Sequence, residues 1–252
     1  MQRNTILWTA SGVAAGALLT SWQLRRWFSE EPEYDVEQSA GSIEIRRYQR
    51  CVRAETTLEA ESWQQALELG FRRLARYIFG ANHRRQLAAQ GQLEERPEPL
   101  RKQGEKIQMT APVTARAVPR DAVSTTAGAL QRYTVAFTLP KARAAGSLPV
   151  PEDRRVHLRA VPARHVAVLR YRGDHGFELM REKSAYLREV LQRAGLSTRG
   201  EPEFAGYDAP STLPWLRRNE IWIELGSAPQ QRSLEAASHA SANNSAFAAT
   251  EA

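Results

Sequence analysis

The segment RRNEIWIEL, residues 217–225, lies near the carboxyl end of the chain and predicts its last strand. Its right half alternates aliphatic side chains with Trp222 and Glu224, the period of two that is typical of a strand with two different faces. Its left half is the polar run from Arg217 to Glu220. We interpret this polar start as a strand that enters the sheet from a solvated edge.

The chain upstream of this strand contains an imperfect internal repeat. Each half begins with strand-like alternation, continues with an apolar stripe of helical period, and then supplies two more strands. In the first half these segments are 42–57, 63–79, 106–113 and 132–140, and in the second half 154–173, 177–194, 202–210 and 219–225. The predicted order is therefore βαββ twice. Two such halves would join through their apolar sheet faces into one sheet or barrel with two helices outside, an α+β fold.

Local signals support the first helix. Ser62 followed by Gln65 three residues later resembles a capping box, and Gly80 suits the carboxyl-terminal cap. The predicted core stripe of this helix is Trp63, Leu67, Gly70, Phe71, Leu74 and Ile78.

The bulk composition indicates an ordinary globular protein with a basic balance. The chain has 252 residues, 42% of them hydrophobic, a formal net charge of +7 and a pI of about 9.9. The arginines are spread along the chain, without a dense basic tract that interleaves with aromatic residues, so we do not expect nucleic acid as a partner. Cys51 is the single cysteine, which excludes an intrachain disulfide and a cysteine-based zinc site.

The amino terminus predicts a membrane segment. Residues 4–24 contain no charged side chain over about the length that a helix needs to cross a bilayer. Arginine flanks the run on both sides, and tryptophan lies near both of its ends, as interfacial aromatic residues do. A cleaved signal peptide is the rival interpretation, because residues 15–17 read AGA, but the apolar run continues beyond that point. We expect an uncleaved single-pass anchor, whose orientation the charges leave open.

These observations divide the chain into four parts. We predict an anchor over 1–28, an acidic linker over 29–35, a folded domain over 36–225, and a disordered tail over 226–252. The tail is small and polar, so it cannot bury enough apolar area to offset the entropy of ordering.

Catalytic and metal-binding signatures are absent from the sequence. There is no G-x-S-x-G elbow, P-loop, G-x-G-x-x-G or H-E-x-x-H motif, and no histidine pair has the spacing of metal ligands. We therefore expect a protein that is not an enzyme and holds no metal ion through its own side chains.

Six segments, in this order, resemble the SOUL haem-binding protein family. They span about residues 33–225: IEIRRY (43–48), ALELGFRRLARYIFGAN (66–82), KIQMTAPV (106–113), VAFTLP (135–140), AGYDAP (205–210) and RRNEIWIEL (217–225). The resemblance implies a distorted antiparallel β-barrel built from two βαββ repeats and flanked by two helices. It also implies binding of haem or a related tetrapyrrole without catalysis.

The resemblance also implies where the ligand would bind. An apolar helix face beside cationic side chains suits haem, because burial drives binding and arginine can pair with the propionates. The candidate residues are Arg47, Leu67, Phe71, Arg72, Ala75, Arg76 and Tyr207.

The chain departs from the family at three of the positions that the resemblance matches. Some members place an iron-ligating histidine at the position of Arg47, and others place a methionine at that of Ala75. An earlier helix position that is arginine in those members is Glu68 here, whereas Arg76 keeps its charge. The sequence thus leaves two functions open: a membrane-tethered tetrapyrrole-binding protein, and a membrane-associated interaction or scaffold domain that keeps the fold without haem.

Overall fold

A computed structural model of the chain describes residues 30–83, 104–119, 130–141, 147–209, 211–229 and 234. The predicted anchor of residues 1–28 lies outside them. Within the described part of the chain, no helix is both long enough and apolar enough to span a membrane.

The described elements follow the predicted repeat. The first half contains β1 (Tyr34–Ala40), β2 (Ile43–Tyr48), β3 (Cys51–Ala60), α2 (Trp63–Ile78), β4 (Asn82–His83), β5 (Val113–Ala117) and β6 (Gln131–Thr138). The second half contains β7 (Val150–Pro151), β8 (His157–Val161), β9 (Arg164–Tyr171), α3 (Phe177–Arg193), β10 (Thr198–Gly206), the 3-10 helix η2 (Pro214–Leu216) and β11 (Asn219–Leu225). The segment predicted as the first strand of each half is a pair of strands, β2 and β3 in one half and β8 and β9 in the other, so each unit reads ββαββ. β1 and the short strands β4 and β7 lie outside these units.

Nine strands form one antiparallel sheet in the order β1-β2-β9-β11-β10-β5-β6-β3-β8, and β4 pairs only with β7. The order exposes the repeat, because β8-β3-β6-β5 on one side of the sheet corresponds to β2-β9-β11-β10 on the other side, with β5 and β10 pairing at the centre. The first two strands of each half, β2 and β3 or β8 and β9, follow each other closely in sequence, but they pair across the halves instead of with each other. β2 pairs with β9 of the second half, and β8 pairs with β3 of the first.

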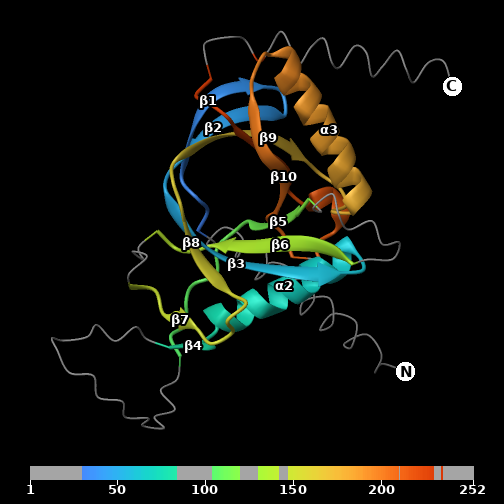
Figure 1. Cartoon of the computed structure of the whole chain (residues 1–252). Helices are drawn as coiled ribbons and strands as arrows, with labels where there is room; N and C mark the ends of the chain where they lie inside the picture. The colour runs from blue at the N-terminus through green and yellow to red at the C-terminus, as the bar shows by residue number, and fades with distance from the viewer. Residues whose placement is uncertain are drawn as a thin grey trace, which may run out of the picture. The chain divides into compact units, whose positions relative to one another are not determined.

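The sheet curls strongly and carries α2 and α3 on its outer side, as Figure 1 shows. The expected closed barrel is not found, since the edge strands β1 and β8 do not pair with each other within the described sheet. Both edges of β2 are already occupied by β1 and β9, and both edges of β3 by β6 and β8. A register shift between Val36 and Gln38 also marks a bulge in β1, a common feature of edge strands.

The strands present two different faces. The helix face carries the main apolar core, which includes Ile45, Leu74, Val135, Leu187 and Ile223. The opposite face, called here the inner face, carries a second, aromatic cluster of buried side chains. Its members are Tyr48, Val166, Val168, Ala205 and Trp222.

The first helix begins and ends as the sequence predicts. The Ser62 hydroxyl accepts a hydrogen bond from the Gln65 amide at 3.2 Å, and Gly80 has a φ of 117°. A Cβ at Gly70 would lie 2.5 Å from Val135 Cγ2, so glycine allows α2 to approach β6 closely. The buried side of α2 is rotated from the predicted stripe. It consists of Trp63, Ala66, Gly70, Leu74, Tyr77 and Ile78, which leaves Phe71 on the exposed flank.

Two segments differ from their predicted structure. The strand expected over 106–113 begins only at Val113, because Pro112 has no amide hydrogen to offer a ladder. The preceding residues follow the end of α2, where the Ile107 amide donates to the Ile78 carbonyl oxygen at 2.8 Å. Leu234, in the segment predicted to be a disordered tail, is buried in the helix-face core.

Candidate functional site

The outer surface of α2 brings together five of the seven predicted site residues. Leu67 and Ala75 are half-buried, whereas Phe71, Arg72 and Arg76 are exposed. The spacing of four residues from Leu67 through Phe71 to Ala75 places these three on one flank of the helix. The Phe71 ring packs on Phe137 of β6 with centroids 5.4 Å apart, so its position is fixed although one edge remains exposed.

Apolar exposure continues beyond this flank to the end of the helix. Phe79, which follows Ala75 by a further four residues, is 61% exposed, and Leu69 is 38% exposed. Three large apolar side chains exposed on one helix and its C-cap form an unusual surface for a protein in water. The α2 surface, defined here as Leu67, Phe71, Arg72, Ala75, Arg76 and Phe79, therefore combines an apolar strip with two cations.

The two arginines of the α2 surface differ in their electrostatic surroundings. Arg72 pairs with Glu68, four residues earlier, and both side chains are exposed. Arg76 lies in the last turn of the helix and makes no ion pair with any described residue. Arg76 is therefore the cation that an anionic group can reach without displacing a carboxylate.

The other two predicted residues lie elsewhere. Arg47 is on β2, where it pairs with Asp35 of β1 at 3.2 Å. Tyr207 follows β10, and its hydroxyl donates to Glu220 Oε2 at 2.8 Å. The structure thus assigns Arg47 and Tyr207 to different environments from the α2 surface, and Tyr207 belongs to a buried polar network.

Glu220 is the centre of that network on the inner face. Its side chain has no exposed area, and it accepts two hydrogen bonds from the Arg46 guanidinium, at 2.9 and 3.1 Å. Arg218, Tyr207 and the Trp222 indole donate to the same carboxylate at distances of 2.8–3.2 Å. The Arg218 guanidinium also lies over the Tyr207 ring, 3.7 Å from its centroid.

The protonation of Glu220 follows from these contacts. Burial alone would raise the pKa of its carboxyl, but the hydrogen bond from Arg46 and the charges of Arg46 and Arg218 lower the pKa to about 2. Burial raises the pKa of the Tyr207 hydroxyl, and the Glu220 charge raises it further. The network is therefore an ionised carboxylate held by positive and neutral donors, a structural arrangement rather than a proton-transfer site.

The interpretation of RRNEIWIEL as a strand that enters from a solvated edge is therefore wrong. Asn219 and Glu220 are both buried, and the polar run joins the strand to the inner face. A signal for this was present in the sequence. Glu220 alternates with aliphatic residues on β11 as Arg46 alternates with Ile45 on β2, which places opposite charges on the same kind of face.

A second buried ion pair lies on the same face. Arg53 of β3 donates to both carboxylate oxygens of Glu203 on β10, at 2.8 and 3.0 Å. Burial raises the pKa of Glu203, but the charges of Arg53 and Arg164 outweigh it and bring the pKa to about 2. The two pairs connect strands from both halves of the repeat across the curled sheet.

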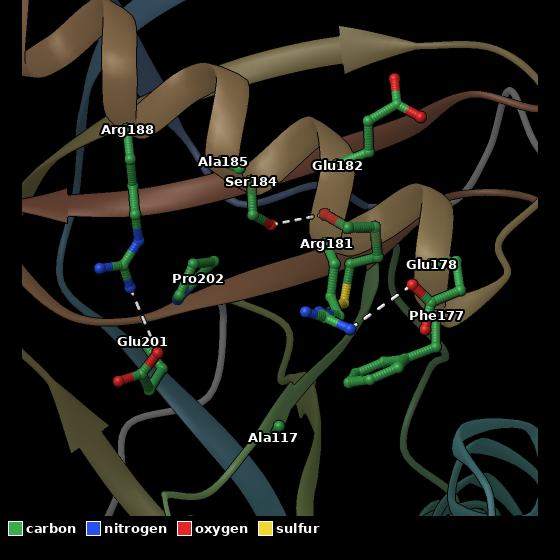
Figure 2. A pocket seen from close by; sticks show the side chains of 11 residues that line it. Ala117, Phe177, Glu178, Arg181, Glu182, Ser184, Ala185, Arg188, Glu201 and Pro202 are labelled. Carbon is green, nitrogen blue, oxygen red and sulfur yellow. Dashed lines mark hydrogen bonds and ion pairs between the residues drawn. The ribbon is translucent and has the colours of Figure 1, made fainter.

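An open groove lies along α3, as Figure 2 shows. Its volume of about 580 Å³ is within the usual range for small-molecule sites. Its apolar lining consists of Ala117, Phe177, Met180, Ala185 and Pro202. On its rim, Arg181 pairs with Glu178 at 3.5 Å and Arg188 with Glu201 at 3.2 Å, so both cations already face a carboxylate.

A metal site is not formed by the side chains of the described residues, among which no group of three or more His, Cys, Asp or Glu could hold an ion.

The chain is similar to several known proteins. A family model described as SOUL heme-binding protein matches residues 29–91 and 97–224. Heme-binding protein 2 of Mus musculus is 26% identical over 220 residues, which cover 86% of this chain and 93% of that protein. Heme-binding protein 2 of Homo sapiens is 25% identical over 221 residues, with the same coverage of both chains. Among solved structures, an uncharacterized conserved protein from Listeria innocua has a TM-score of 0.48 and 11% identity, covering 74% of this chain and 93% of that one.

Proposed function

Because the chain belongs to the SOUL heme-binding protein family, we propose that it binds haem or a related tetrapyrrole on the α2 surface and catalyses no reaction. The observation that carries this proposal is that exposed Phe71 and Phe79, on α2 and at its C-cap, lie on the same helix as Arg76, a cation that makes no ion pair with any described residue. A tetrapyrrole is a large apolar disc with two carboxylates. Such a surface can bury the disc and pair with a propionate.

The side chains of α2 can contact the porphyrin plane and its propionates, but they do not provide an axial ligand for the iron. All residues of α2 are described, and none is histidine, cysteine or methionine. Tyr77 is buried, and its hydroxyl donates to the Pro149 carbonyl oxygen, so it does not face a ligand on the outer surface. Haem itself would supply a redox-active iron. The chain would hold it through apolar contact and charge, without an axial ligand from this helix.

Replacing Arg76 with alanine is expected to weaken haem binding by about 1–3 kcal/mol, the range for a hydrogen bond to a charged group. The measurement is a haem titration of the full chain in detergent, followed by the Soret absorption. We expect a broad Soret band of moderate affinity, since no strong axial ligand comes from the helix. A bis-histidine spectrum would contradict the proposed mode of binding.

Arg188→Ala is the matched control for Arg76→Ala, because it removes an exposed arginine from the other helix. It should leave the titration unchanged. Loss of affinity in Arg188→Ala but not in Arg76→Ala would place the ligand in the α3 groove. If the wild-type chain gives the same spectrum as free haem in the same detergent, the scaffold function that needs no ligand is favoured.

We also propose that the chain is tethered to a membrane through residues 4–24. The support is the uncharged run between Arg3 and Arg25, which has the length and the flanking aromatic residues of a spanning helix.

The full chain is therefore expected in the membrane fraction and should remain there through washing with high salt and with alkaline carbonate. Such treatments release proteins held by charge but not a spanning helix. The measurement is immunoblotting of the fractions together with amino-terminal sequencing. A mature chain that starts near Leu18 in the soluble fraction would show a cleaved signal peptide instead.

A further inference from the structure

The loop between β10 and β11 exposes three large apolar side chains in succession. Leu213, Trp215 and Leu216 are 50%, 63% and 43% exposed, and Trp215 is the most exposed large apolar residue of the described chain. We call residues 211–216 the Trp215 loop. A tryptophan so placed exposes apolar area that water disfavours.

The backbone of this loop is held in place. The Leu216 amide donates to the Leu213 carbonyl oxygen at 2.9 Å, closing the turn of η2. The Gly173 amide donates to the Pro214 carbonyl oxygen at 3.1 Å, which ties the loop to the end of β9. The three apolar side chains are thus presented outward by a fixed turn, because the hydrogen bonds fix the backbone beneath them.

Both signs of charge surround the loop. Arg172 is exposed and makes no ion pair with any described residue, whereas the half-exposed Arg170 pairs with Glu220 at 3.4 Å. The acids nearby are engaged, since Asp174 pairs with Arg217 and Asp208 accepts the Arg218 amide. Arg172 is therefore the cation next to this segment that can face an anionic group such as a phosphate.

The chain also enters the folded domain beside this loop. Arg218 Nη1 donates to both carboxylate oxygens of Glu31, at 3.1 and 3.2 Å. Only six residues, 25–30, lie between Glu31 and the end of the uncharged run at Leu24, a separation of seven Cα steps. Fully extended, they reach at most about 25 Å. If residues 4–24 span a bilayer, at most this length of chain joins that span to Glu31.

We propose that the Trp215 loop docks onto a phospholipid bilayer, with Trp215 and the two leucines at the level of the headgroups and Arg172 facing lipid phosphate. The inference rests on the proposed membrane tether for its geometry. The lipid surface is favoured as occupant by the point of chain entry and by the chemistry of the tip. Tryptophan prefers the interface between headgroups and hydrocarbon, and arginine pairs with phosphate.

The test uses the full chain in vesicles that contain lipids brominated on their acyl chains, which quench nearby tryptophan. The emission of Trp215 is obtained as the difference between wild type and Trp215→Phe. We expect this difference emission to be blue-shifted and quenched, and the double change Leu213→Asn and Leu216→Asn to remove most of the quenching. Val150→Asn alters an exposed apolar residue on β7 and should change nothing. Vesicles with and without phosphatidylglycerol distinguish anionic from zwitterionic lipid as the phosphate source, and quenching in either supports docking.

Alkaline carbonate extraction of the same samples separates this inference from the tether. A chain that resists extraction while Trp215 stays unquenched would overturn the docking and keep the tether. A chain that is extracted, but whose Trp215 is quenched when vesicles are present, would overturn the tether and support docking as a peripheral contact. An extracted chain with unquenched Trp215 would overturn both.

Discussion

Replacing Glu220 with alanine is expected to lower the free energy of unfolding by about 3–5 kcal/mol, the cost of breaking a buried ion pair by removing one partner. The carboxylate accepts from Arg46, Arg218, Tyr207 and Trp222, and Arg46 has no exposed side-chain area. Without Glu220, the acidic partner that Arg46 keeps among the described residues is Glu44, at 2.7 Å. Several donors then lose their acceptor in a place that water does not reach.

Urea unfolding followed by circular dichroism measures this effect. Arg47→Met is the matched control, because it removes the neighbouring arginine from an exposed pair and should change stability by no more than about 0.5 kcal/mol. Equal losses in the two variants would contradict the central role of Glu220.

The pKa of Glu220 is about 2 in the folded chain, below its usual 4.5. Its contribution is therefore present above pH 4.5 and lost as the pH falls toward 2, so the variant should lose part of the acid dependence of stability.

Leu74→Ala is expected to cost about 2–5 kcal/mol of the free energy of unfolding, because it leaves a cavity in the helix-face core. Leu74 has no exposed area and belongs to the same core as Val135, at the interface of α2 with the sheet. The same unfolding measurement applies.

Arg72→Ala on the opposite side of α2 is the control for Leu74→Ala. The Arg72 side chain is 66% exposed, so its removal should change stability by no more than about 0.5 kcal/mol. A large loss in Arg72→Ala would mean that the outer surface of α2 supports the fold rather than being free for a ligand.

The helices and the repeat could be predicted from the sequence because both depend on local patterns. The cap at Ser62, the stop at Gly80 and the helical period of Leu187 and Leu191 are readable without knowing what packs against them. Strand order could not be predicted in this way. The pairing of β2 with β9 joins residues more than a hundred positions apart, and no local pattern encodes it.

The candidate site was predictable to the same extent. Five residues share one helix, so periodicity places them together. Arg47 and Tyr207 came from motifs on other elements, and their surroundings depend on tertiary pairing. The buried Arg46–Glu220 pair was missed for a related reason. The alternation of Arg46 and Glu220 with aliphatic residues suggests the same kind of face, but only the pairing of distant strands shows that the two charges meet there.

The exchanged hairpins have a consequence for how this fold can be divided. A fragment that ended after β6 would leave one edge of β3 bare, and a fragment that began at β8 would leave β9 without β2. Each half also holds one member of both buried ion pairs, so a separated half would carry Arg46 and Arg53, or Glu203 and Glu220, without the partner that each has in these pairs. The two halves are interlocked, because each contributes a strand that pairs within the sheet of the other. The duplicated unit is therefore no longer an autonomous module, and only both copies together make a complete domain.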